Sequence, residues 1–163
     1  MTDQIIAAFA GFPNWLAVIL LSMIPVTELR ATIPVAILAW DMQPIVVFFL
    51  ALIGNAIPFF PIFFGFLAAR RCIEQRLPWT VRWFDRLLAR AHRKLGNKFE
   101  KYGMFGLAMF VAIPFPGTGV WMGTLIAVAL ELPFRRAVIA VLGGEIVMGV
   151  IVLALTLAGR TAV

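Results

Sequence analysis

A glutamate and an arginine stand two positions apart in the middle of an apolar stretch. Glu28 and Arg30 lie in the run IPVTELRATIP. Ionisable side chains are costly inside a membrane and often have a function there. A carboxyl group can carry a proton or face a cation, whereas a guanidinium binds phosphate through parallel hydrogen bonds. We therefore expect both residues to bind substrate and Glu28 also to carry protons. The alternative is that the pair neutralises itself or caps helix ends.

A second candidate is the run PFPGTG from Pro114 to Gly119. Gly117 and Gly119 allow a close approach of the backbone. Thr118 adds a hydroxyl group, and the free amides at the start of a following half-helix favour an anion. We expect Gly117, Thr118 and Gly119 to bind an anionic headgroup. The alternative is a tight turn that allows two hairpins to pack.

Two more polar residues stand in apolar blocks, each beside glycine. Glu145 lies in the run GGEIVMG, where small glycines permit another helix to approach closely. A membrane-embedded carboxyl group suits a proton carrier, so we expect Glu145 to take part in proton coupling. Its alternative role is a hydrogen bond to a neighbouring helix. Asn55 follows Gly54, and it either lines the substrate cavity or forms a hydrogen bond across helices.

The remaining residues favour neither catalysis nor metal binding. The sequence contains no nucleophile with a matching base, no phosphate-binding glycine loop with a lysine, and no paired metal ligands. Cys72 and His92 are the single residues of their kind and are too few for a tetrahedral zinc site. We expect the protein not to be an enzyme, and we expect no catalytic residue, cofactor or metal.

The composition is that of a membrane protein. Of the 163 residues, 63% are hydrophobic and 13% are charged, and the mean hydropathy is +0.99. Soluble domains are close to half apolar and about a quarter charged. A globule of this size has too little interior to bury so many apolar side chains, so a bilayer must cover the remainder.

Most basic residues gather in one central segment. Ten of the fourteen Lys and Arg residues fall between positions 70 and 101. Short loops of this kind stay in the cytoplasm. Apolar residues recur at helical spacing from 79 to 95, which predicts an amphipathic helix at the membrane surface. This helix either packs on the membrane bundle or contacts anionic lipids. We expect membrane lipids as its partner and no nucleic acid.

Four apolar blocks remain, and they are of two kinds. Two blocks are long enough to cross a hydrocarbon core of roughly 30 Å as one helix. The other two are broken, the first by Pro25 and Pro34 and the second by PFPGTG. Their length suits two half-helices that meet at an irregular tip, which is a re-entrant hairpin. In chain order we expect a re-entrant hairpin at 14–40, a transmembrane helix at 44–69, the basic linker at 70–101, a second re-entrant hairpin at 103–130 and a transmembrane helix at 137–158.

The two halves of the chain correspond to each other. An ungapped offset of 89 residues places Pro44 on Pro133 and Gly54 on Gly143. One hairpin and one crossing helix per half make the halves inverted, with both termini outside and the basic linker in the cytoplasm. We therefore expect a single membrane domain over residues 1–163. It is an all-α integral membrane protein of a bacterial-type inner (plasma) membrane, built as an inverted repeat. Transporters often use this plan, with the binding site where broken helices meet.

Three runs resemble the small multidrug export protein family: PVTELRATIPVAI, GNAIP and KYGMFGLAMFVAIPFPGTGVWMGTLIA. The resemblance covers nearly the whole chain and implies export. The opposed hairpins are more distantly similar to the DedA and VTT superfamily, which implies a carrier of undecaprenyl phosphate or a phospholipid scramblase. Glu28 matches the acidic residue of that superfamily's first hairpin. The arginine motif of its second hairpin has no match in PFPGTG, so Arg30 would have to serve instead.

These observations favour one function and leave two alternatives. The leading hypothesis is a transporter or flippase that moves an anionic amphiphile, such as a polyprenyl phosphate, between leaflets. Arg30 and the amides around Thr118 would receive the phosphate, and Glu28 and Glu145 would couple protons. The first alternative is an exporter of lipophilic cations, and the second is a membrane scaffold that transports nothing. Two hairpins make a small cavity, so we expect a homodimer.

Overall fold

The computed structural model describes residues 11–76, 97–115 and 118–161. The amphipathic helix expected at 79–95 and the candidate residue Gly117 lie outside these ranges. Within the ranges every regular element is an α-helix, as predicted. The helices are α2 (Asn14–Met23), α3 (Glu28–Leu38), α4 (Pro44–Ala56), α5 (Phe59–Arg76), α7 (Asn97–Ala112), α8 (Val120–Ala129) and α9 (Phe134–Thr161).

The first apolar block forms two short helices, α2 and α3, with a break between them. Ile24 is extended (φ −77°, ψ 131°), which is the conformation favoured before a proline, here Pro25. α3 begins at Glu28, whose φ of 42° lies in the left-handed region. Pro34, which was expected to break the block, lies inside α3. The helix continues through it because packing of buried neighbours such as Ile33 offsets the one hydrogen bond that proline removes.

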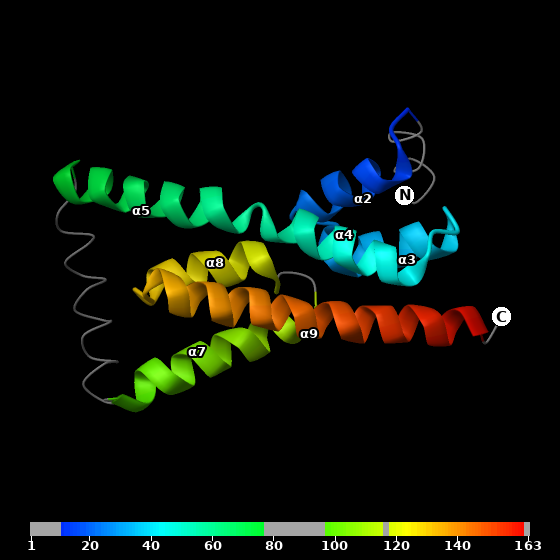
Figure 1. Ribbon diagram of the computed structural model, residues 1–163. Helices are drawn as coiled ribbons and strands as arrows, with labels where there is room; N and C mark the ends of the chain where they lie inside the picture. Colours follow the sequence, from blue (N-terminus) through cyan, green and yellow to red (C-terminus); the bar gives the residue numbers. More distant parts are fainter. Residues whose placement is uncertain (1–10, 77–96, 116–117, 162–163) are drawn as a thin grey trace.

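The second broken block forms α7 and α8. α7 ends at Ala112, just before Pro114, whose ring would clash with the preceding turn of a helix. α8 follows Gly119, whose φ of 146° is accessible to glycine and strained for any residue with a Cβ. The chain therefore reverses direction here, and each broken block becomes a pair of short antiparallel helices (Figure 1).

Two stretches are long and apolar enough to cross a membrane. They are Pro44–Ala68, with 25 residues, and Phe134–Thr161, with 28. A hydrocarbon core of about 30 Å needs about 20 such residues. α9 is continuous and extends beyond the expected range 137–158 at both ends. Together with the composition, these helices are typical of a helical membrane protein.

The first of these stretches is divided into α4 and α5. The helix expected over 44–69 is interrupted at Ile57 and Pro58. Pro58 has no amide hydrogen to donate to the carbonyl oxygen of Gly54, so the regular ladder stops there. α5 nevertheless continues in nearly the same direction as α4 (Figure 1).

α9 lies along the middle of the bundle, and the other helices pack around its two halves (Figure 1). One core cluster joins α2, α3 and α4 to the C-terminal half of α9, through Met148 and Val152. A second cluster joins α5, α7 and α8 to the N-terminal half, through Ala137 and Val141. The tips of the two short helix pairs therefore meet about halfway along α9.

Each half contains a glycine that lets a short helix touch the crossing helix. A Cβ on Gly54 would overlap with the backbone of Ile19 in α2, and a Cβ on Gly144 would overlap with the backbone of Ala108 in α7. Ile19 and Ala108 are 89 positions apart, whereas the two glycines are 90 apart. The offset of 89 pairs Gly54 with Gly143, where a Cβ would meet open space. The two glycine contacts are therefore one residue out of step with that alignment.

Candidate functional site

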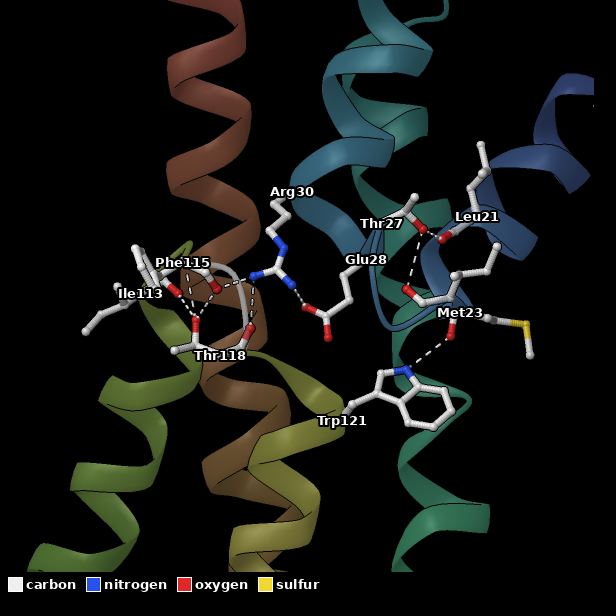
Figure 2. Close-up of polar contacts among 10 residues, drawn as sticks. Leu21, Met23, Thr27, Glu28, Arg30, Ile113, Phe115, Thr118 and Trp121 are labelled. Atoms are coloured by element: carbon white, nitrogen blue, oxygen red, sulfur yellow. Dashed lines mark hydrogen bonds and ion pairs between the residues drawn. The ribbon is translucent and has the colours of Figure 1, made fainter. Parts of the chain in front are cut away.

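The tips of the two helix pairs face each other, and charged side chains of α3 lie between them (Figure 2). Glu28 is only 2% exposed and the side chain of Arg30 is 14% exposed. Thr118 and Gly119 of the second tip are the expected site residues that lie beside them. The structure therefore brings together four residues that the sequence had placed in two separate runs.

The guanidinium of Arg30 connects the two tips. Its Nη1 donates to the carbonyl oxygen of Phe115 and, at 3.2 Å, to that of Thr118. Its Nη2 lies 3.4 Å from Oε2 of Glu28. Figure 2 shows this side chain reaching from α3 to the loop between α7 and α8. Arg30 thus holds a loop that lies far from it in the sequence.

The carboxyl group of Glu28 lies against the start of α8. The backbone amide of Trp121, in the first turn of that helix, donates a hydrogen bond to it. A Cβ on Gly119 would overlap with the carboxyl group. The free amides of a helix N-terminus stabilise a negative charge. In this conformation, the position expected for an anionic headgroup is filled by the carboxyl group of the protein itself.

The hydroxyl group of Thr118 is used within its own loop. Its oxygen lies 2.6 Å from the carbonyl oxygen of Ile113 and 2.7 Å from that of Phe115. The amide of Phe115 donates to it at 3.3 Å. Since a hydroxyl has one hydrogen, it donates to one of these carbonyls at a time. Thr118 therefore closes the loop and does not present a free hydroxyl to a substrate.

Two contributors to the site were not anticipated. Nε1 of Trp121 donates to the carbonyl oxygen of Met23 at 3.1 Å, and the Thr27 hydroxyl donates to that of Leu21. Both contacts satisfy carbonyls at the end of α2, which would be costly to bury without a partner. The signals in the sequence were a hydroxyl residue shortly after Pro25 and a tryptophan shortly after PFPGTG. Neither signal identifies its partner.

Asn55 of α4 and Glu145 of α9 form a second buried polar pair. Asn55 is 0% exposed and Glu145 is 1% exposed. The Asn55 amide lies next to the carboxyl group of Glu145, and the negative charge of Glu28 also acts on that carboxyl group. Even so, both amide atoms of Asn55 and Oε1 of Glu145 lack a partner in hydrogen-bond geometry within the described part of the chain. The two side chains are thus close, deeply buried and incompletely satisfied.

A cavity of about 400 Å³ extends from the tips along α3 and the C-terminal half of α9. We call it the α3–α9 groove. Arg30 and Pro114 lie at the end near the tips, and Gly159 lies toward the end of α9, next to the exposed ion pair of Arg160 with Asp41 at 2.8 Å. The lining residues are Arg30, Pro34, Leu38, Pro114, Val152, Leu155, Thr156 and Gly159.

Comparison with known proteins shows to which family the chain is similar. A family model described as "Putative small multi-drug export protein" matches residues 28–151. The matched range begins at the first residue of α3 and contains Arg30, Asn55 and Glu145. No curated protein matches the chain, and neither does any solved structure.

Proposed function

The chain belongs to the small multi-drug export family, and from that premise we propose that it is a membrane transporter whose substrate is an anionic amphiphile, such as a polyprenyl phosphate. The position of Arg30 at one end of the apolar α3–α9 groove carries this proposal. A cation beside a long apolar surface is complementary to a molecule with an anionic head and a hydrocarbon tail.

The present hydrogen bonds of Arg30 can be replaced by hydrogen bonds to such a headgroup. Nη1 is bound to two neutral carbonyl oxygens, those of Phe115 and Thr118. A phosphate oxygen carries charge and forms a stronger hydrogen bond to guanidinium than a neutral carbonyl does. Binding of the headgroup would therefore exchange the loop carbonyls for phosphate oxygens, while Glu28 remains at the start of α8.

The lengths of the short helices support a re-entrant arrangement. α2 and α8 have 10 residues each, which corresponds to about 15 Å and thus to half of a hydrocarbon core of about 30 Å. The equivalent glycine contacts of Gly54 and Gly144 support two inverted repeats. With this arrangement, the distribution of basic residues supports a cytoplasmic linker and places both ends of the chain outside in our proposal. We propose a bacterial-type inner membrane as its location. A homodimer stays a prediction.

The two halves of the bundle differ in packing between equivalent helix pairs. The α3–α9 groove is open, whereas Phe59 and Phe63 of α5 are buried in the core cluster that includes α8. Their rings stack with centroids 5.6 Å apart, and Phe134 packs on Phe63 at 5.4 Å. This asymmetry fits a transporter whose binding groove faces the outer side while the cytoplasmic half is closed.

Export of lipophilic cations is the second candidate function. Its support is the presence of two buried carboxyl groups, Glu28 and Glu145, either of which could face a cation. The Arg30 guanidinium beside Glu28 would repel such a substrate. The anionic substrate is therefore favoured by the groove and its one cationic end.

Transport by the purified protein in proteoliposomes tests the proposal. The assay compares a fluorescent polyprenyl phosphate with a lipophilic cation, in the parent protein and in Arg30→Gln. Arg135→Gln is the matched control because Arg135 is exposed and lies outside the groove. We expect movement of the phosphate lipid that is lost in Arg30→Gln and retained in Arg135→Gln.

The other results assign the function differently. Cation movement that survives Arg30→Gln and is lost on neutralisation of a glutamate would identify a cation exporter. Movement of neither compound by a folded protein would favour a scaffold whose partners are bound by the basic linker.

A further inference from the structure

The Asn55–Glu145 pair occupies equivalent positions in the two halves of the chain. Asn55 directly follows Gly54, and Glu145 directly follows Gly144. A Cβ on the first of these glycines would overlap with the backbone of α2, and a Cβ on the second would overlap with the backbone of α7. The pair therefore lies where the crossing helices α4 and α9 contact each other, between the two halves.

Within the part of the chain that the structure describes, few charged side chains belong to the helices packed around Glu145. The sequences of α2, α4, α7 from Gly103 onward, and α8 contain no titratable side chain. α3 contributes Glu28, whose negative charge acts on Glu145, and Arg30, which is paired with Glu28. An ionised Glu145 would thus be a buried negative charge that the negative charge of Glu28 also repels, which is a costly arrangement without a compensating cation. A bound proton removes that cost.

We propose that Glu145 carries the proton that drives transport, with Asn55 as its partner in both protonation states, and that Glu28 is a structural group. This proposal rests on the proposed transport function for its role, although the proton site itself does not depend on the substrate. In the protonated state the Glu145 hydroxyl donates to Oδ1 of Asn55. When the proton leaves to water, Nδ2 of Asn55 donates to the carboxylate.

The unsatisfied atoms of the pair support this assignment. An amide offers one acceptor and a donor group, so it can match either form of a carboxyl group, which a purely donating or accepting partner cannot do. Both amide atoms of Asn55 and Oε1 of Glu145 are without a hydrogen-bond partner among the described residues, so a small rotation of either side chain can select either pairing. Oε2 of Glu28 also lacks a hydrogen-bond partner among these residues, but it lies 3.4 Å from Nη2 of Arg30.

Glu28 has a different environment. Its carboxyl group is held by Arg30, by the Trp121 amide and by close contact with Gly119. Loss of its charge would weaken contacts that join the two tips. These contacts give Glu28 a structural role, which is to hold the two tips together.

A proton fits the Glu145 site better than a metal ion. Hard metal ions prefer six or more oxygen ligands, or near-ideal octahedral geometry. Among the residues that the structure describes, no group of three His, Cys, Asp or Glu side chains could hold a metal ion. The site offers one carboxyl group and one amide.

Infrared difference spectroscopy of the full-length protein in liposomes tests the proposal without any substrate. A protonated buried carboxyl group gives a C=O stretching band that shifts in deuterium oxide. We expect this band at neutral pH in the parent protein, its loss in Glu145→Gln, and its shift in Asn55→Leu, where the hydrogen-bonding partner is removed. The band should persist in Glu28→Gln and in Glu131→Gln, which changes an exposed carboxyl group.

The spectra also separate the other outcomes. Loss of the band in Glu28→Gln with retention in Glu145→Gln would overturn the assignment, as would the absence of any protonated carboxyl band. Loss of the parent band when sodium chloride replaces choline chloride would identify a sodium site and overturn the proton assignment. If Glu145→Gln does not fold, Glu145→Asp replaces it, and an unshifted band in that variant would refute the proposal. Failure of phosphate-lipid transport with these bands present would reject the substrate and leave the proton site standing.

Discussion

The carboxyl group of Glu28 lies where a side chain on residue 119 would have to be placed. A Cβ built on Gly119 overlaps with Oε2 of Glu28, although the two residues are far apart in the sequence. The absence of a side chain at 119 lets the carboxyl group reach the amide of Trp121 at the start of α8. The contact between the two tips therefore depends on one glycine.

Gly119→Ala should lower the free energy of unfolding by at least about 2 kcal/mol. The new methyl group would collide with Glu28, and alanine is strained at a φ of 146°. Gly106→Ala is the control because a Cβ there meets open space within a helix. Denaturant unfolding in detergent micelles compares the two variants. Equal stability of both would show that Glu28 does not pack on Gly119.

Gly144→Ala and Gly143→Ala should differ although the residues are neighbours. A Cβ on Gly144 would press on the backbone of Ala108, so we expect a loss of roughly 1–3 kcal/mol from the displaced helices. A Cβ on Gly143 meets open space, and the better helix propensity of alanine should leave stability unchanged or raised by up to about 1 kcal/mol. Thermal unfolding of the two variants measures the difference. The reverse order would place the contact at Gly143, as the offset of 89 residues suggests.

The losses of stability in Glu28→Gln and in Arg30→Gln should add up to more than the loss in the double variant. Removal of either partner leaves the other as a buried and less compensated charge, which costs about 3 kcal/mol. The double variant leaves neither charge, so the coupling energy should be about 1–3 kcal/mol. Unfolding of the four proteins of the cycle provides this value. Additive losses would mean that the two side chains do not interact in the membrane.

Leu155→Trp should stop transport without changing stability by more than about 0.5 kcal/mol. Leu155 lines the α3–α9 groove and is 65% exposed, so a larger ring can fill the groove without disturbing the core. Val147→Trp is the matched control, since Val147 is also exposed on α9 but does not line the groove. Transport rates and melting temperatures of both variants are compared. Undiminished transport by Leu155→Trp would exclude the groove as the substrate path.

Much of the helical organisation follows from local chemistry that the sequence contains. Pro25 and the run PFPGTG interrupt their blocks because proline removes an amide hydrogen and crowds the preceding turn. The same reasoning gave a wrong prediction for the helices that contain or precede two other prolines. Pro34 is accommodated in α3, whereas Pro58, in a block expected as one helix, separates α4 from α5. Whether proline breaks a membrane helix depends on neighbouring helices that can compensate for the missing hydrogen bond, and those neighbours are known only in three dimensions.

The sequence by itself determined that this protein is a helical membrane protein and that Glu28, Arg30 and Glu145 stand in apolar surroundings, because hydropathy and residue type are local properties. Tertiary structure decided their partners. It placed Arg30 on the carbonyls of Phe115 and Thr118, and it selected Gly144 over Gly143 for the contact with α7. Successive helical residues point about 100° apart, so a one-residue change in register turns a side chain to another face. Only the packed arrangement of the helices sets that register.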